Sequence, residues 1–483
     1  MQRLRTRPRQ PEAHPLTIDL AIAETALTDL IELEQFGYGR FNYRDHRPYA
    51  IDPFSGIWIE GPYLLAFRQS ITTPEEASAY LVRLHSLSEA LQDTRRRLIA
   101  DRAAGIYLPR DLARETQERL GQLTSDDPSA LGLLATTVEA LMRDVPDLES
   151  AEREMMLELV GNEVDLVLRP AYMDLITTLS ETSDDFANQA GIWALPDGTT
   201  LFGDVLEAAN GVAVNRDELH QRLNSLTETQ KRLLEALLTI PPAAEGEEAP
   251  IAPTALSDRL AWFNAAMAEP ATETSDALNV PSDGVLESLA PLPVWDRVRM
   301  AADDPSQGLA WQIYADLLSE SPYSAWGPGE DLPNHRQILE FPAIQDAIRW
   351  YIWDQSEVEI SPVDRAARAQ VSLIQRGLAT IDTGLHLERW TLSEATSYMV
   401  NMTGLDEDIA RQLALSVMAQ PGFHAATAIA RERIGTLSER AQAVLANRYV
   451  ELDFQRALLI SGPRPLPLLE RDIEAWYADL LSN

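Results

Sequence analysis

Apolar residues recur at helical spacing along most of the chain. Between Thr73 and Gly105, apart from the adjacent pair Tyr80 and Leu81, they follow one another at intervals of three and four positions: Ala77, Tyr80, Leu81, Leu84, Leu87 and Leu91. This spacing predicts an amphipathic helix with one buried stripe. Thr73 is the expected cap, with Pro74 at the first helical position. Glu76 is expected to complete a capping box, and Gly105 to end the helix.

The same pattern predicts further helices over much of the sequence. They cover about 109–123, 129–144, 148–181, 216–239, 336–354, 361–381, 391–403, 406–419, 425–445 and 466–481. Strand signals are few: residues 49–61 and 191–203 combine β-branched and aromatic side chains with Pro and Gly. The expected fold is therefore mainly α, with a small β-hairpin on a large helical body.

Composition divides this body into parts. Residues 1–15 contain four arginines and are expected to form a flexible basic arm, because no apolar segment of a signal peptide follows. A Pro-, Ala- and Glu-rich stretch begins at Pro241, so residues 241–300 are expected to be a loop-rich connection. The helical halves are then 16–240 and 301–483, which we expect to form one continuous structural unit.

Charge narrows the classes of partner. Asp and Glu number 75 against 40 Lys and Arg, a formal net charge of −35, which disfavours binding to nucleic-acid phosphates and is typical of a soluble protein. No stretch approaches the roughly 18 apolar residues of a membrane span, so we expect no membrane partner and a cytoplasmic location. The absence of cysteine excludes disulfides, thiolate nucleophiles and Cys-type zinc sites.

The histidines exclude one kind of metal site. The seven are widely scattered, and the closest two, His14 and His46, lie 32 positions apart. A helix that binds zinc through an HExxH motif needs two imidazoles one turn apart, so that motif cannot form here. The sequence also lacks a G-x-S-x-G elbow and a glycine-rich phosphate loop. With 75 carboxylates, acidic neighbours are expected by chance and indicate no catalytic pair.

Several segments together resemble the bacterial domain-of-unknown-function 885 family. They are TPEEASAYLVRLHSLSEALQDTRRRLIADRAAGIYLPRDL, GIWALPDGTTLFGDVLEAANGVAVNRDELH, DTGLHLERWTLSEATSYMVNMTG and ISGPRPLPLLERDIEAW. The resemblance covers the chain from about residue 70 to its end, with a gap in the middle. It implies a zincin-like helical body, similar to the gluzincin zinc peptidases, built from two helical halves.

The departures from the family pattern concern the metal site. The family's HEAxPGHH segment would be expected between His220 and Asp382, where this chain has only His335. LAWQIYAD resembles the family's EGWALYAE helix but has Leu309 in place of the glutamate, and leucine cannot bind zinc. Other family polar residues are replaced by Phe423, Thr427, Gln455 and Leu378, with Arg376 two positions before the last. The resemblance thus implies a pseudo-peptidase without metal, cofactor or catalytic residues.

Five residues are candidates for lining a residual cleft: Trp311, Tyr314, Asp382, His386 and His220. Each has a simpler interpretation. The aromatic pair has helical spacing, which is more typical of core. Asp382 and His386 share a helix face, where a local hydrogen bond that fixes a helix end is favoured over a binding role. His220 is expected to be a structural hydrogen-bonding group rather than a base.

Three functions remain open. The first is a non-catalytic, peptidase-shaped protein that binds a peptide, a small molecule or a protein. The second is a hydrolase whose site was rebuilt from carboxylates and His386, His335 or His220. The third is a structural subunit of a protein complex, which exposed apolar patches would favour.

Overall fold

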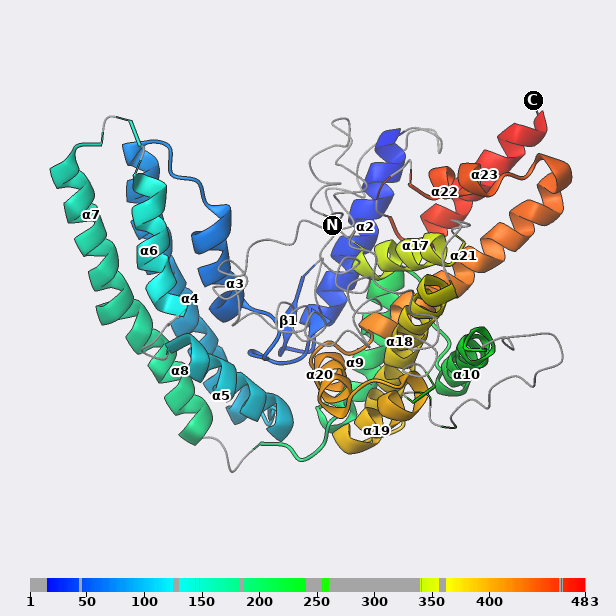
Figure 1. Ribbon diagram of the computed structural model, residues 1–483, viewed down its shortest axis with the longest axis horizontal. Helices are drawn as coiled ribbons and strands as arrows, with labels where there is room; N and C mark the ends of the chain where they lie inside the picture. The colour runs from blue at the N-terminus through cyan, green and yellow to red at the C-terminus, as the bar shows by residue number, and fades with distance from the viewer. Residues whose placement is uncertain are drawn as a thin grey trace, which may run out of the picture. The chain divides into compact units, whose positions relative to one another are not determined.

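The described part of the chain is mainly helical (Figure 1). The computed structural model describes residues 15–42, 46–124, 130–181 except 144 and 147, 186–239, 341–355 and 362–482 except 460, 461 and 463, together with 254, 256, 258, 259 and 339. Backbone contacts group these residues into two compact units. One contains Tyr49–Gln189, and the other contains the described residues before and after that range.

The unit Tyr49–Gln189 is built from helices. They are α3 (Ile57–Tyr63), the π-helical turn η1 (Leu64–Arg68), α4 (Pro74–Ala103), α5 (Arg110–Thr124), α6 (Ala130–Met142), α7 (Ser150–Glu163), the π-helical turn η2 (Val164–Leu168) and α8 (Arg169–Glu181). Because α7, η2 and α8 follow one another without a break, the helix predicted over 148–181 is confirmed as one continuous rod with a wider turn inside it.

Helix α4 shows how the sequence specifies this unit. Its buried apolar side chains are those of the predicted stripe, with Leu81 half-buried. The Thr73 side chain accepts a hydrogen bond from the Glu76 N–H at 3.2 Å, while the Glu76 carboxylate accepts from the N–H of Thr72 at 2.6 Å. At the other end Gly105 has φ +83°, and the Ile106 N–H donates to the Asp101 carbonyl at 2.9 Å. This is a Schellman ending, as the glycine predicted.

The other unit contains the remaining elements. They are α2 (Pro15–Glu34), β1 (Arg40–Phe41), β2 (His46–Arg47), the short 3-10 turn η4 (Ile192–Ala194), α9 (Gly198–Asn210), α10 (Leu219–Leu237), α17 (Pro342–Gln355), α18 (Pro362–His386), α19 (Leu392–Thr403), α20 (Glu407–Ala419), α21 (Phe423–Leu445), η5 (Ala446–Arg448), α22 (Glu451–Leu459) and α23 (Leu466–Ser482).

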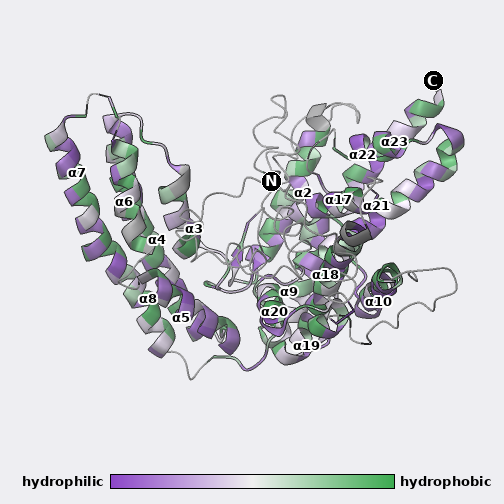
Figure 2. Cartoon of the chain, in the orientation of Figure 1, coloured by the Kyte–Doolittle hydropathy of each residue, from purple (hydrophilic) through white to green (hydrophobic). Residues whose placement is uncertain are grey.

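Helix α18 is the centre of this second unit. It packs against α10, α19, α20 and α21, and its side chains from Val371 to Ile374 and from Gly377 to His386 are buried. A separate apolar core joins α2, α17, α21, α22 and α23 around Phe454 and Ile434, both fully buried. Most helices carry hydrophobic and hydrophilic residues on different faces, as Figure 2 shows. The amphipathic stripes are therefore covered by neighbouring helices.

The two predicted strand segments were wrong, although a small hairpin exists. The hairpin pairs β1 with β2 in antiparallel register, Arg40 with Arg47. Residues 49–61 instead lead into α3, and residues 191–203 form η4 and the start of α9. Buried positions in α9 (Leu201, Phe202, Val205, Leu206, Ala209) have helical spacing that continues beyond the predicted strand. A short apolar run does not distinguish a strand from a buried helix turn.

Helices α2, α3, α9 and α22 were not predicted. The predicted division at 241–300 stays a prediction, since almost all of that range and of the arm 1–15 lies outside the described residues. In the described chain no single helix has the length and apolar character to cross a membrane; α20 and Phe423–Arg448, which meet at 89°, pass that test only as a bent pair.

Candidate functional site

Four polar side chains lie along the last turns of α18. Thr380, Asp382, Thr383 and His386 are all fully buried. A polar group that is buried away from water without a hydrogen-bond partner destabilises the folded protein, by about 1–3 kcal/mol in mutational data. The partners of these groups therefore decide what they can do.

His386 has both ring nitrogens occupied. Its Nδ1 accepts a hydrogen bond from the Ile192 N–H at 3.2 Å, and its Nε2 lies 3.2 Å from the Val417 carbonyl oxygen. Because the first is an acceptor and the second must be a donor, these contacts assign the neutral Nε2–H tautomer. Burial lowers the pKa of His386 to about 4, so the ring is uncharged at neutral pH. The Phe202 ring stacks on it at 5.7 Å.

Asp382 holds the start of α21. Its Oδ1 accepts from the Gly422 N–H at 2.8 Å and its Oδ2 from the Ala425 N–H at 3.0 Å. Burial raises the pKa of Asp382 to about 7, while backbone donors from Gly422, Ala425 and His424 favour the charged form. The helix N-terminus also favours negative charge. Asp382 is thus a buried helix anchor.

Asp382 and His386 do not form a proton relay. Their closest atoms, Asp382 Oδ1 and His386 Nε2, are 3.9 Å apart, too far for a hydrogen bond. Neither the imidazole nor the carboxylate reaches solvent. The two residues connect α18 with η4, α20 and α21, so their role is to hold these helices together.

His220 lies at the edge of this cluster and is half-buried. In α10, its Nδ1 lies 2.9 Å from Thr383 Oγ1, and the Trp390 ring meets its edge at 5.1 Å. Burial lowers the pKa of His220, and Glu388 opposes that shift. The structure thus brings His220 of α10 next to the helix that carries Asp382 and His386, but does not place the three in a common pocket.

The other two candidates, Trp311 and Tyr314, lie outside the described residues, as do Leu309 and His335. A zinc ion needs several side-chain donors with free lone pairs. In the part of the chain that the structure describes, no group of three or more His, Asp or Glu side chains could hold a metal ion. The segments that the resemblance compares with the family's zinc motifs, around Leu309 and His335, lie outside those residues.

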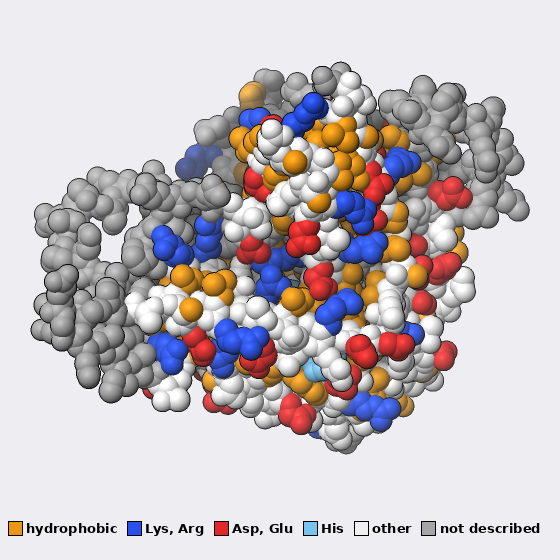
Figure 3. All heavy atoms as spheres, turned by 90° about the vertical axis from the view of Figure 1, so that its right-hand side faces the viewer, with side chains coloured by type: hydrophobic (Ala, Val, Ile, Leu, Met, Phe, Trp, Pro, Cys, Tyr) orange, Lys and Arg blue, Asp and Glu red, His pale blue; other side chains and the backbone are white. Residues whose placement is uncertain are grey.

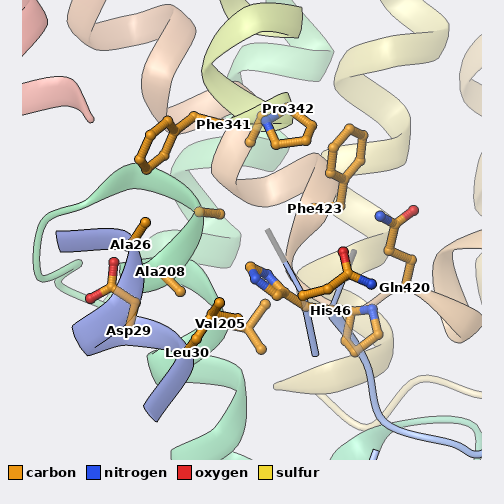
Figure 4. A pocket seen from close by; sticks show the side chains of 14 residues that line it. Ala26, Asp29, Leu30, His46, Val205, Ala208, Phe341, Pro342, Gln420 and Phe423 are labelled. Atoms are coloured by element: carbon orange, nitrogen blue, oxygen red, sulfur yellow. The ribbon is translucent and has the colours of Figure 1, made fainter. Parts of the chain in front are cut away.

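A small cavity lies elsewhere in this unit, between α2, α9 and the start of α21 (Figure 4). Its volume is about 30 Å³, the space of about one water molecule. Asp29, His46, Gln420 and Phe423 are among its lining residues. Burial raises the pKa of Asp29 to about 7, with Glu32 and Glu207 adding to the shift. The cavity is too small for an organic ligand.

The partners of this cluster could not be predicted from the sequence. Ile192, Val417 and Gly422 contribute backbone atoms, and Ile192 is 194 positions from His386. Every residue type offers the same N–H and carbonyl groups, so no side-chain motif indicates these contacts. The one available signal was the set of polar residues on the otherwise apolar end of α18.

Comparisons with known proteins agree with the resemblance. Residues 1–301 and 356–473 match the sequence profile of a family described as bacterial protein of unknown function (DUF885). No curated protein matches the chain significantly.

Two solved structures share the fold. A putative lipoprotein from Colwellia psychrerythraea superposes with a TM-score of 0.81 at 17% identity, covering 99% of this chain and 89% of its own. A putative lipoprotein of unknown function from Shewanella oneidensis gives 0.58 at 10% identity, covering 97% and 89%. At these identities the likeness concerns the fold alone.

Proposed function

Starting from the fact that this chain belongs to the bacterial DUF885 family, whose function is unknown, we propose that it is a non-catalytic, peptidase-like protein that binds a ligand. The observation that carries the proposal is the burial and the hydrogen bonding of His386 and Asp382. Both are fully buried, and their polar atoms are bonded to backbone groups. A metallopeptidase needs a metal-activated water and a glutamate that moves its proton, and both must contact the substrate.

The rival proposal, a hydrolase with a rebuilt site, needs a histidine and at least two carboxylates at a pocket. His386 has one nearby carboxylate, Asp382, and no access to solvent. His220 is bonded to a threonine hydroxyl. These arrangements support the non-catalytic proposal over the rival. His335, the third histidine of that proposal, lies outside the described residues.

The test combines metal analysis with an activity assay on the purified full-length chain. We expect no stoichiometric zinc after purification in zinc-containing medium, and no cleavage of a mixed peptide library with or without added zinc. About one zinc per chain, together with peptide cleavage that a chelator abolishes, would sink the proposal. A His386→Gln chain serves as the control, because a side chain with no access to substrate should not alter either readout.

We also propose that the protein does not bind nucleic acid, because its formal net charge is −35, and that it is cytoplasmic. The two similar structures carry the description of putative lipoproteins, which gives this proposal a concrete competitor. Fractionation of the native cells tests it: recovery of the chain in the membrane fraction after a salt wash would contradict it.

A further inference from the structure

Arginines gather around one carboxylate where α17, α18 and α21 meet. Asp354 of α17 accepts a hydrogen bond from Ser372 Oγ on Oδ1 at 2.8 Å, and Arg431 Nη2 donates to its other oxygen. Arg376 also lies within the electrostatic reach of Asp354 and of Arg431. The Arg431 guanidinium carbon lies over the Trp350 ring, 5.9 Å from the centroid of that ring. Arg376 and Arg431 therefore share Asp354, with Glu432 as a second carboxylate and Arg368 as a third arginine in the same neighbourhood.

Arg376 and Arg431 have donors without partners. The Arg376 side chain is half-buried and makes no hydrogen bond or ion pair within the described residues; its Nε is shielded from solvent. Arg431 is only 8% exposed, and its Nε is also shielded and without a partner. The next carboxylate along α21, Glu432, is paired with Arg222 at 3.3 Å. It does not supply the missing acceptor.

This arrangement leaves charged donors without an acceptor. Burial and the neighbouring charge of Arg431 together lower the pKa of Arg376 to about 10, yet the guanidinium stays protonated at neutral pH. A shielded N–H of a charged group costs more than a neutral one when it lacks an acceptor. Planar guanidinium groups present parallel N–H donors that match the two oxygens of a carboxylate or phosphate.

We infer that Arg376 and Arg431 form a binding site for an oxyanion, a carboxylate or phosphate group of a small ligand or peptide. The inference rests on the proposed ligand-binding function and names the chemical class of the ligand. Arg376 would contact the anion directly. Arg431 would contact it through donors that Asp354 does not occupy. Because the whole chain carries a charge of −35, long-range attraction cannot explain binding, and the local donors must.

The experiment measures binding of inorganic phosphate and of acetate to the full-length chain by isothermal titration calorimetry at constant ionic strength. Arg376→Gln removes the charge of the donor that has no partner, and we expect affinity to fall about tenfold or more, the effect of losing one charge-assisted hydrogen bond. Arg433→Gln is the matched control. Arg433 is also on α21, but it is 51% exposed and paired with Glu470 at 2.8 Å. The affinity of the R433Q chain for phosphate and acetate should equal that of the wild type.

A second variant separates binding from folding. Asp354→Asn removes the competing negative charge beside Arg431, so we expect phosphate and acetate to bind more tightly. General damage to the fold would weaken binding in both variants. Equal affinity in the wild type, R376Q and R433Q would overturn the inference. So would a D354N chain that is folded by circular dichroism and binds more weakly than the wild type.

Two further arms identify the source of the anion. A short peptide with a free C-terminal carboxylate is compared with its amidated form, and tighter binding of the free acid than of phosphate assigns the site to peptide termini. Preference for phosphate assigns it to a phosphorylated ligand; in both cases R376Q must abolish the preference. Chelator-sensitive peptide cleavage with normal R376Q-sensitive binding would reject the non-catalytic proposal and leave the oxyanion site standing.

Discussion

Buried polar residues act here as connectors between distant segments. His386 joins η4 to α20 through two backbone groups, and Asp382 positions the first turn of α21. The sequence could predict that these two side chains share a helix face, because they are four positions apart. It could not predict their partners, since the bonds go to backbone atoms whose positions depend on tertiary packing.

Replacing His386 tests this role through pH. Its folded pKa, about 4, is below the unfolded value of about 6.5, so its contribution to stability is present above pH 6.5 and is lost as pH falls towards 4, by up to about 3 kcal/mol. We expect His386→Gln to lower the free energy of unfolding at pH 7 by about 1–3 kcal/mol. The difference from the wild type should shrink between pH 6.5 and 4 in urea titrations.

His85→Gln is the control of opposite sign. His85 is exposed and its Nδ1 donates a hydrogen bond to the Glu163 carboxylate at 2.8 Å, and this bond with the carboxylate charge raises the pKa of His85. Its contribution is therefore present below the unfolded pKa and is lost as pH rises. The effect of H85Q should be small and largest at low pH. An H386Q difference that grows as the solution is acidified would contradict the assignment of a neutral, buried imidazole.

At the scale of elements, long helices were easier to predict from the sequence than short ones, which could be mistaken for strands. Long stripes such as that of α4 repeat over many turns, so their period is unambiguous. Segments 49–61 and 191–203 hold only a few apolar residues each, too few to show a period. In the folded protein they contribute to α3 and α9. Helix ends followed local chemistry, because glycines at positive φ stop several of them.

Two of these glycines give a matched test. Gly105 ends α4 with φ +83°, and a Cβ atom added there would have no neighbour within 4 Å. Gly211 ends α9 with φ +68°, and a Cβ atom added there would lie 2.3 Å from the Pro465 Cβ. We expect Gly105→Ala to cost about 1–2 kcal/mol from backbone strain alone. Gly211→Ala should cost about 1–3 kcal/mol more, because the chain must also move. Equal losses in denaturant unfolding would show that the contact relaxes freely.

At the scale of the whole molecule, charge is the dominant sequence property. The face seen in Figure 3 carries Lys and Arg side chains interspersed with Asp and Glu, so positive groups are not gathered into one broad patch there. The formal charge of −35 nevertheless means net repulsion within the folded chain. The fold itself, mainly α with a small hairpin, follows from apolar periodicity and not from this charge.

Screening should therefore stabilise the protein. The Debye length shortens from about 30 Å at 0.01 M to about 10 Å at 0.1 M ionic strength, which weakens repulsion between surface carboxylates. We expect Tm to rise between these two NaCl concentrations in differential scanning calorimetry. Choline chloride should have the same effect at equal ionic strength, since screening does not depend on the cation's identity. A Tm that falls or stays constant would show that attractive pairs outweigh the net repulsion.

The π-helical turn η2 has a consequence for comparing relatives. Val160, Val164, Leu168 and Tyr172 are buried at intervals of four, and each interval advances a regular α-helix about 40° beyond a full turn, about 120° over three. One extra residue in the wide turn absorbs roughly that rotation. Leu166, 71% exposed, lies within it. A homologous rod one residue shorter would keep the same apolar seam, so an alignment gap belongs at this turn.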